Sequence, residues 1–500
     1  MLESSSLPPV SLSPIRVRFA PAPTGNLHIG GLRTALFNFL FARHHKGFFL
    51  LRIEDTDIER SKDEYTQAIL DGFTWVGIQS DEPLVIQSER NGEHKLIIEK
   101  LLKEGKAYRC YCTQEMVVER HNLSHPGDPF IKYDGQCRSL IRYDTTFQQS
   151  TSTFVIRFAI PEKRSEIIFD DLICGKLSFS IDQLDDFIIV RSDGSPMYNF
   201  VVVADDAFMR ISHVIRAQEH IINTPKQILL YEACGYVVPH FAHVPLILGP
   251  SGEKMSKRDG ATSVLEYRKE GYLPEALLNY LARLGWAHGD QEIFTLDELI
   301  AYFSLEHVGK KGAIFDGIKL KWLNKHYIRH KTADYLYTYA VNNLDGSIQN
   351  LLSQCYAHNN IQLFAFIDLY KERVDTIKEL IELVLMVIKG PDQFLGQFNA
   401  QDIEKWITPP TVGYLQQIVV YLVDSWPKRS DSMQVDLAQV KNLVKSVADK
   451  NGLTLVQLAQ PIRIALQGSS SGPGVFELMH ILGKDEIIRR IQNMCNYVQK

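Results

Sequence analysis

The sequence has no long hydrophobic run and few cysteines. None of its apolar segments approaches the roughly 20 residues that a membrane-spanning helix needs. Its seven cysteines, an odd number spread over 500 residues, do not form the dense framework of disulfide-rich secreted domains. These two features favour a protein of the reducing cytoplasm that does not contact a membrane.

An excess of basic residues is also missing. The 54 lysines and arginines are outnumbered by 59 aspartates and glutamates, and the net charge is −5. This balance excludes a protein that coats nucleic acid through general positive charge, although a local basic face still suffices for one RNA partner. The first 14 residues lack the apolar core of a secretion signal and the Arg-rich pattern of a transit peptide, so we expect a loose tail there.

The two common glycine-rich nucleotide-binding patterns, Gly-x-Gly-x-x-Gly and Gly-x-x-x-x-Gly-Lys-Ser/Thr, are absent as well. Instead, residues 15–19 predict a short strand, prolines and a glycine end it, and residues 30–40 have helical spacing. The free N–H groups at a helix N-terminus suit phosphate, and His28 adds a side-chain donor there. Gly30 and Gly31 would let a nucleotide approach the backbone. Alone, the pattern is equally that of a plain strand–turn–helix with an incidental histidine.

A second candidate stretch lies far downstream. Lys254, Lys257 and Arg258 fall within five residues, around Ser256, in a segment flanked by glycine and proline. Cations on such a loop suit the β- and γ-phosphates of a nucleotide. Taken alone, this stretch would be interpreted as a solvated basic turn.

Together, the two stretches resemble the signature motifs of class I aminoacyl-tRNA synthetases. Three longer segments resemble the bacterial-type glutamyl-tRNA synthetases: residues 21–31 (PAPTGNLHIGG), 51–57 (LRIEDTD) and 460–463 (QPIR). The resemblance runs from about residue 15 to the C-terminus. One position departs from the first motif, since Gly31 stands where the name of that motif implies a second histidine. This departure concerns only a second imidazole, and His28 keeps the role of the first.

The resemblance implies a multidomain α/β protein. Its doubly wound, Rossmann-like catalytic domain is split by an α+β insertion and followed by all-helical C-terminal domains. The helical spacing of apolar residues past Ser263 agrees with this, and it argues against a bacterial glutaminyl enzyme with β-barrels there. The expected parts are a tail (1–14), the first catalytic half (15–92), the acceptor-end-binding insertion (93–197), the second catalytic half with the lysine loop (198–262), a helical stem-contact domain (263–333) and a helical anticodon-binding region (334–500).

Within this plan the residues also predict individual strands. Short β runs are expected at 154–158, 167–169 and 177–180. Two further strands, over 187–191 and 197–203, would flank the turn Ser-Asp-Gly-Ser. A last strand of the sheet is expected over 243–248, directly before the lysine loop.

The activity implied by the resemblance is ATP-dependent charging of tRNA(Glu) with L-glutamate through a glutamyl-adenylate, with Mg²⁺, in a cytoplasmic monomer. His28, Lys254 and Lys257 would be catalytic. The implied ATP site consists of Pro21, Thr24, Gly25, His28, Gly30, Gly31, Lys254, Ser256, Lys257 and Arg258. The implied glutamate site consists of Arg18, Ala20, Ala22, Glu54, Tyr198 and Arg216. Arg373 is expected near the tRNA anticodon, though a surface arginine on a helix accounts for it equally well.

The choice of Arg216 also has a chemical reason. A planar guanidinium pairs bidentately with a carboxylate, which selects glutamate over glutamine by charge. Its structural alternative is an ion pair with Asp205 or Glu219. Glu54 follows a buried strand, where open α/β sheets place ligands, and suits the α-ammonium group of the substrate.

A possible metal site lies in the insertion, where Cys110, Cys112 and later Cys137 resemble a zinc site carried by some members of the family. A structural zinc ion takes four ligands. The position two residues past Cys137, where the family pattern has a histidine, is Ser139. Tyr133 is one candidate for the fourth ligand, and His121 and His125 are others. A metal-free remnant held by packing is the alternative.

Other functions remain to be weighed against this one. The nearest is the same enzyme with relaxed choice of tRNA, charging tRNA(Gln) as well. A nucleotidyltransferase of the same fold would share the histidine motif but leaves the long helical region unexplained. A catalytically inactive tRNA-binding module is disfavoured by the presence of His28, Lys254 and Lys257.

Overall fold

The structure is a computed structural model of the chain. It describes residues 14–57, 59–127, 131–143, 153–255, 263–391, 398–425 and 437–498. Its internal contacts divide it into two compact units, Met1–Leu265 with Leu278–Asp316 and Glu266–Leu277 with Gly317–Lys500. Of the tail expected over residues 1–14, only the last residue is described. In the part of the chain that the structure describes, no helix is both long and apolar enough to span a bilayer.

Parallel strands form the centre of the first unit. β1 (Arg16–Phe19), β2 (Phe48–Ile53) and β3 (Val85–Ile86) pair in that order, and β9 (His213–Ala217) pairs with β10 (His240–Val244). β1 and β9 lie side by side, since the amide of Ser212 donates to the carbonyl of Arg16 at 2.9 Å. The two groups of strands thus follow one another in the order 3-2-1-9-10.

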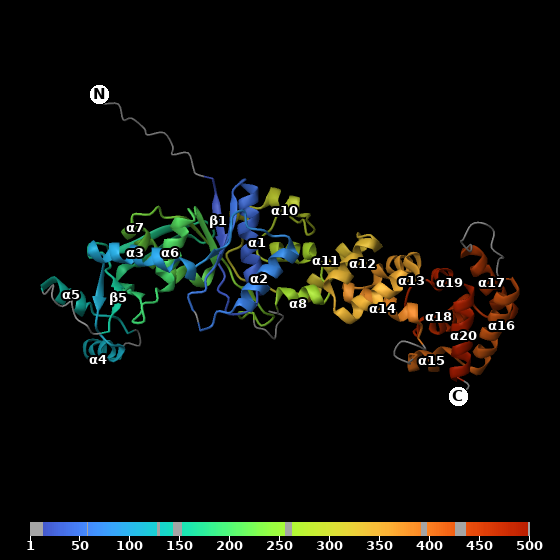
Figure 1. Ribbon diagram of the computed structural model, residues 1–500. Helices are drawn as coiled ribbons and strands as arrows, with labels where there is room; N and C mark the ends of the chain where they lie inside the picture. Colours follow the sequence, from blue (N-terminus) through green and yellow to red (C-terminus); the bar gives the residue numbers. More distant parts are fainter. Residues whose placement is uncertain are drawn as a thin grey trace, which may run out of the picture. The chain divides into compact units, whose positions relative to one another are not determined.

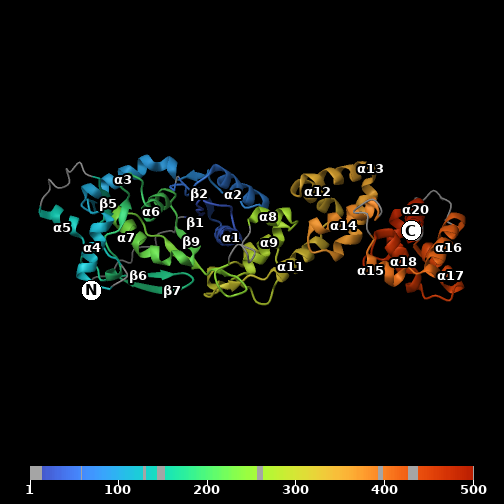
Figure 2. The same ribbon diagram turned by 90° about the horizontal axis from the view of Figure 1, so that it is seen from below.

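Helices cover both sides of these strands. In both ribbon views α1 (Ile29–His44) and α2 (Asp63–Val76) lie on one side of β1, and α3 (Asn91–Lys103), α6 (Tyr198–Phe208) and α7 (Thr224–Cys234) lie on the other (Figures 1 and 2). α7 has proline in its first turn and ends at Gly235, whose φ of 75° suits a residue without a side chain. This arrangement confirms the predicted doubly wound α/β fold.

The insertion has its own small antiparallel sheet. β4 (Ala107–Cys110), β5 (Val155–Phe158) and β8 (Ile188–Val190) pair in that order, and α4 (Gln114–Ser124) and α5 (Gln136–Tyr143) lie between β4 and β5 in the chain. A hairpin of β6 (Glu166–Asp171) and β7 (Gly175–Ser180) follows β5. β6 joins the central strands by pairing in parallel with β10 at Asp171 and Phe241.

Two of the expected strands were wrong in detail. Residues 197–203 are not a strand, because α6 begins at Tyr198 and runs to Phe208. Phe200, Val201, Val202 and Val203 are all buried, so this run has no polar face, and a short run without a polar face fits a helix as well as a strand. The expected strand over 243–248 is two strands: β10 ends at Val244, Pro245 follows, and β11 (Ile247–Leu248) pairs with β12 (Ala313–Ile314).

The remaining elements of the first unit follow the lysine loop. α8 (Val264–Lys269) and α9 (Pro274–Arg283) each have residues in both units, whereas α10 (Leu296–Tyr302) lies wholly in the first. Arg33 on α1 donates to the carbonyl of Leu284 at 3.0 Å and to the carbonyl of Pro245. Burial lowers the pKa of Arg33 to about 10. This side chain therefore joins α1 to two loops that leave the sheet region.

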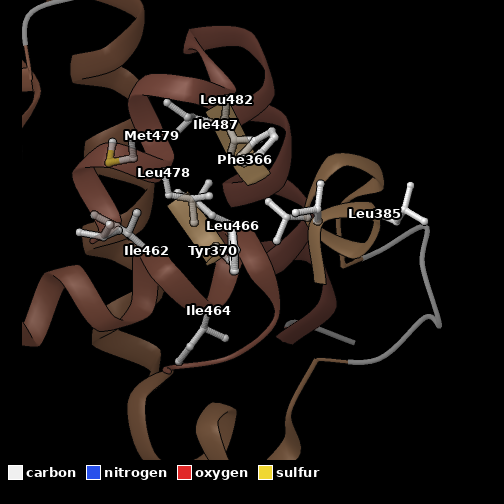
Figure 3. Close-up of a cluster of buried hydrophobic side chains, with 14 of the residues drawn as sticks. Phe366, Tyr370, Leu385, Ile462, Ile464, Leu466, Leu478, Met479, Leu482 and Ile487 are labelled. Atoms are coloured by element: carbon white, nitrogen blue, oxygen red, sulfur yellow. The ribbon is translucent and has the colours of Figure 1, made fainter. Parts of the chain in front are cut away.

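The second unit contains helices and no strand among its described residues, which confirms the expected helical C-terminal region. Its helices are α11 (Gly317–Arg329), α12 (Ala333–Asn343), α13 (Gly346–Tyr370), α14 (Ile377–Lys389), α15 (Ala400–Trp406), α16 (Pro409–Ser425), α17 (Leu437–Lys450), α18 (Leu455–Gln467), α19 (Val475–Leu482) and α20 (Lys484–Val498). Their apolar faces share one core, in which Phe366, Ile462 and Leu478 are fully buried (Figure 3).

Candidate active site

A cavity of about 530 Å³ lies in the first unit, at the carboxyl ends of β1, β2 and β9. Open α/β sheets bind ligands at this edge. The predicted site residues that line it are Arg18, Ala20, Ala22, Thr24, His28, Gly30, Gly31, Glu54, Tyr198, Arg216 and Lys254. Pro21 and Gly25 belong to the same loop but are not among the lining residues. Ser256, Lys257 and Arg258 lie outside the described residues.

His28 caps the N-terminus of α1. The backbone N–H of Gly31 donates to Nδ1 of His28 at 3.2 Å. Because Nδ1 is the acceptor, the proton of the neutral ring is on Nε2. Burial lowers the pKa of His28, and the charge of Lys254 lowers it further. His28 therefore presents a neutral ring with an N–H donor at Nε2.

Gly30 provides the space for this ring. A Cβ at Gly30 would lie 3.0 Å from Nδ1 of His28 and 3.1 Å from its Cε1. Such contacts are closer than ordinary van der Waals contact, so a side chain here would require the imidazole to shift slightly. Glycine at this position thus keeps both the backbone and the histidine accessible from the cavity.

The described ends of the lysine loop both lie close to the loop of His28. Lys254 lines the cavity, and its Nζ lies 2.7 Å from a carboxylate oxygen of Glu219. At the other end Ser263 forms an antiparallel bridge with His28, and the amide of Val264 donates to the carbonyl of Leu27 at 2.8 Å. The two motifs that are 226 residues apart in the sequence (254 − 28) therefore meet at one site.

A buried network of charges borders the cavity, which two of its members, Arg18 and Glu54, line. Asp206 accepts from Nε of Arg18 at 3.0 Å and from Nη1 of Arg52 at 2.6 Å, and Arg52 also donates from Nη2 to Glu54 at 2.9 Å. Burial alone would raise the pKa of Asp206, but Arg18 and Arg52 hold it below its ordinary value. For Glu54 burial prevails and raises the pKa despite Arg52. Two guanidinium groups and two carboxylates thus balance one another.

Arg52 and Asp206 are the members of this network that the sequence analysis missed. The available signal was Arg52 itself, a lone charge in an otherwise apolar strand. Such a charge is tolerated in a buried strand only with a partner. The identity of the partner was not evident, because Asp206 lies 154 residues away in the chain.

Arg216, in contrast, has no carboxylate partner among the described residues. Its Nε donates to Nε2 of His243 at 3.2 Å and its Nη2 to Oγ1 of Thr224 at 2.8 Å, whereas Nη1 is buried and has no protein partner. The two carboxylates considered as alternatives are engaged elsewhere: Glu219 pairs with Lys254 and Asp205 with His94 and Arg90. The free Nη1 of a cavity-lining guanidinium indicates a site for an acidic group of a ligand.

Tyr198 lies beside this arginine at the beginning of α6. Its hydroxyl is 3.2 Å from Nδ1 of His220. Burial raises the pKa of Tyr198, so the hydroxyl stays protonated and available as a donor at neutral pH.

The three cysteines of the insertion come together as well. The sulfur atoms of Cys110, Cys112 and Cys137 all lie within 4.8 Å of one another. Tyr133 stands beside them: its hydroxyl accepts from the amide of Cys137 at 2.7 Å and is hydrogen-bonded to Cys110. A hydrogen bond from Cys137 lowers the pKa of Cys110, which favours the thiolate form that binds metals. Neither His121 nor His125 belongs to the cluster.

The position expected to contact the anticodon lies in the second unit. Arg373 ends the short turn after α13 and is exposed. Burial lowers the pKa of Arg463, and the positive charge of Arg373 lowers it further. The charge of Arg373 also acts on Tyr370. Arg373 thus adjoins the second unit's QPIR segment, and it is not part of the cavity.

Known proteins match the chain over almost its whole length. Residues 14–322 match the family described as "tRNA synthetases class I (E and Q), catalytic domain", and residues 332–495 match "Anticodon binding domain". The "Glutamate--tRNA ligase" of Pelobacter propionicus is 43% identical over 497 residues, 98% of this chain and 100% of that protein. The "Glutamate--tRNA ligase 1" of Syntrophus aciditrophicus is 45% identical and covers 98% of each chain.

A solved structure agrees with these sequence matches. The crystal structure of a glutamate tRNA ligase from Elizabethkingia meningosepticum, in complex with its amino acid, matches with a TM-score of 0.83 and 32% identity, over 97% of this chain and 99% of that one. The catalytic family model alone covers more than half of the chain, and the relatives cover 98% of it. The chain belongs to the class I tRNA synthetases of the E and Q type.

Proposed function

We propose that the protein is a glutamate–tRNA ligase, which activates L-glutamate with ATP and transfers it to the 3′ end of tRNA(Glu). The observation that carries this proposal is Arg216, a residue that lines the cavity and whose buried Nη1 has no hydrogen-bond partner in the protein. Full-length relatives at 41–45% identity are named glutamate–tRNA ligases, which supports the same activity.

Recognition of glutamate follows from the charges around the cavity. The side-chain carboxylate of the substrate pairs with Arg216, and a neutral amide in its place would leave a buried guanidinium uncompensated. Glu54 has one oxygen engaged by Arg52, and we assign its other oxygen to the α-ammonium group. Arg18 is held by Asp206 and contributes a fixed positive charge nearby.

Activation requires attack of the glutamate α-carboxylate on the α-phosphate of ATP, with pyrophosphate leaving in line. The Nε2–H of His28 and the free N–H groups at the start of α1 donate to the α-phosphoryl oxygens as charge develops there. Lys254 exchanges Glu219 for the leaving pyrophosphate, and we assign Lys257 the same partner. Mg²⁺ would supply positive charge that offsets the charge of the phosphate groups. Catalysis then consists mainly of positioning, since no covalent enzyme intermediate is formed.

Transfer needs the 3′ end of the tRNA at the same cavity. We assign the acceptor end to the insertion, residues 93–197, and the anticodon to the helical region around Arg373. The 2′-hydroxyl of the terminal adenosine takes the glutamyl group from the adenylate. We further propose that the enzyme acts as a cytoplasmic monomer.

The cysteine cluster fits a structural zinc ion. Three sulfur atoms at these separations supply three of the four ligands that such sites take, and the hydroxyl of Tyr133 beside them is the candidate for the fourth. Cys110, Cys112, Cys137 and Tyr133 would hold the ion and so connect β4 to α5. Metal analysis of the purified protein tests this: we expect about one zinc per chain in the wild type and none after Cys112→Ser. A metal-free wild type would leave the cluster as a packed remnant.

The activity itself is tested by charging purified tRNA(Glu) and tRNA(Gln) transcripts separately with glutamate. We expect charging of tRNA(Glu) and its loss in Arg216→Gln. Charging of both transcripts would establish an enzyme of relaxed tRNA choice. If neither is charged, although ATP and the chain together form an adenylate with another acid, the nucleotidyltransferase alternative replaces this proposal.

A further inference from the structure

Arg216 donates a hydrogen bond to the buried His243, which in turn contacts the buried Asp171. Arg216 lies on β9 directly opposite His243 on β10, and β10 in turn pairs with the end of β6 at Asp171. His243 is fully buried and Asp171 nearly so. Neither residue lines the cavity. Three adjacent strands thus place a carboxylate, an imidazole and a guanidinium in one line.

The hydrogen bonds along this line have a defined direction. Nδ1 of His243 lies 2.6 Å from Oδ2 of Asp171, and its Nε2 accepts from Nε of Arg216 at 3.2 Å. A carboxylate only accepts, so the proton of His243 is on Nδ1 and the lone pair on Nε2 faces the guanidinium. Burial lowers the pKa of His243, which keeps the ring neutral beside Arg216.

We propose that Asp171 and His243 are positioning residues, which fix the orientation of Arg216 and thereby the recognition of the substrate carboxylate. The inference rests on the proposed function, since it assigns Arg216 to that carboxylate. The hydrogen bonds of Nε to His243 and of Nη2 to Thr224 fix the guanidinium plane, and they leave Nη1 as the nitrogen without a protein partner in a residue that lines the cavity. Pre-orientation of this kind reduces the entropy that ordering would cost when the substrate binds.

Asp171→Asn is an informative substitution because existing backbone hydrogen bonds fix the orientation of the new side-chain amide. Oδ1 of Asp171 accepts from the backbone amides of Ile173 at 3.0 Å and Cys174 at 2.8 Å. The amide oxygen of the new asparagine must take this place, so its NH₂ group faces Nδ1 of His243. The ring proton then moves to Nε2, which lies 3.1 Å from Oγ1 of Thr224, and Nε of Arg216 loses its acceptor. The substitution thus reverses which side chain donates in the hydrogen bond between positions 171 and 243, and it changes few atoms.

The experiment measures glutamate-dependent ATP–pyrophosphate exchange in the presence of tRNA(Glu), with separate KM values for glutamate and ATP. For Asp171→Asn we expect a KM for glutamate about 10- to 100-fold higher, the size of one lost hydrogen bond to a charged group. The KM for ATP and kcat should change little, as expected when ground-state and transition-state binding weaken alike. Discrimination against glutamine should fall in the same variant.

Two variants of His243 separate its two hydrogen bonds. In His243→Asn the shorter side chain retains a donor for Asp171 but has no acceptor at the Nε2 position, so the KM for glutamate should rise. In His243→Gln the longer side chain can place its carbonyl oxygen near that position, so the KM should stay closer to the wild type. Combining Asp171→Asn with His243→Asn should add nothing to His243→Asn, because Asp171 acts through His243.

A matched control exists in the same unit. His94 and Asp205 form another fully buried pair, with Nε2 2.8 Å from Oδ1, but neither lines the cavity nor touches Arg216. His94→Gln should therefore leave the KM for glutamate unchanged, even if it lowers the melting temperature. If Asp171→Asn or, should that variant not fold, His243→Asn leaves the KM for glutamate at the wild-type value, the inference is overturned. A wild-type enzyme that does not activate glutamate would instead refute the proposed function.

Discussion

At the scale of single residues, His28 has a structural and a chemical task, on different atoms of one ring. Nδ1 caps α1 by accepting from Gly31, and this bond leaves the Nε2 proton for a phosphoryl oxygen. A substitution by alanine removes both at once. Asparagine can retain the cap, since its side-chain oxygen accepts in the same way, but it has no donor that reaches the Nε2 position.

The prediction for His28→Ala is a fall in adenylate formation of about 10²–10³-fold, the size of one lost oxyanion-type donor. The lost cap should also reduce the free energy of unfolding by about 1 kcal/mol. His28→Asn should restore most of this stability while activity stays low. ATP–pyrophosphate exchange and urea unfolding measure the two effects separately. Near-normal exchange in either variant would remove His28 from the proposed mechanism.

Residue types alone indicated much of the site, but not its second layer of partners. The histidine and lysine motifs, Glu54 and Arg216 were all predicted, and the structure places those that it describes around one cavity. Asp206, His243 and Asp171 were missed as partners. Each is a common residue whose role depends on a contact made across the sheet, between positions 27 to 188 residues apart. Periodicity and local spacing do not indicate which distant residues pair with one another.

At the scale of elements, the correct prediction of a helix or a strand depended on whether the segment has a polar face. The strand of residues 15–19 was predicted from an apolar run that prolines and a glycine end, and the helix after it from helical spacing. Residues 200–203 are buried on every side, and there the pattern carried no information on helix or strand. The local pattern does not predict which elements are connected to one another. A buried polar side chain often makes such a connection.

Asn324 on α11 is such a side chain in the second unit. Its Oδ1 accepts from the amide of Leu273 at 2.8 Å, and its Nδ2 donates to the carbonyl of Asp375 at 2.7 Å. Asn324→Ala removes the partner of the buried amide of Leu273 and of the partly buried carbonyl of Asp375, which should cost about 1–3 kcal/mol of unfolding free energy.

Hydrogen exchange of peptides from α11 and α14 reports this loss directly. The control is Asn343→Ala, because Asn343 donates only to Tyr339 of its own helix. We expect that variant to cost less than about 1 kcal/mol. Equal protection in Asn324→Ala and the wild type would show that the connection is not needed.

At the scale of the whole molecule, the described chain divides into two compact units that are not simply successive in sequence. Residues 266–277 belong to the second unit, although residues 278–316 belong to the first. The order of catalytic and helical parts was implied by the family resemblance, and composition alone did not contain it. The interleaving of the two units was not predicted, because it depends on which core Leu273 and Ala276 join, and both join the helical one.

The division into two compact units predicts that unfolding has two transitions. A ligand of the cavity should change the melting temperature of only one of them. Every residue that lines the cavity belongs to the first unit. A ligand stabilises only what it binds, by about 2.7 kcal/mol at 100 times its Kd. A stable analogue of glutamyl-adenylate should therefore raise the melting temperature of one transition by several degrees and leave the other within about one degree.

Scanning calorimetry with and without the analogue measures both transitions, and hydrogen exchange identifies which unit each one belongs to. Protection should increase in peptides of β1, α1 and β9, and not in those of α16 or α18. Arg216→Gln should abolish the shift while leaving two transitions, which separates binding from domain architecture. A single transition that moves as a whole would mean that the two cores unfold as one cooperative system, and the division of the chain into independently stable units would then be wrong.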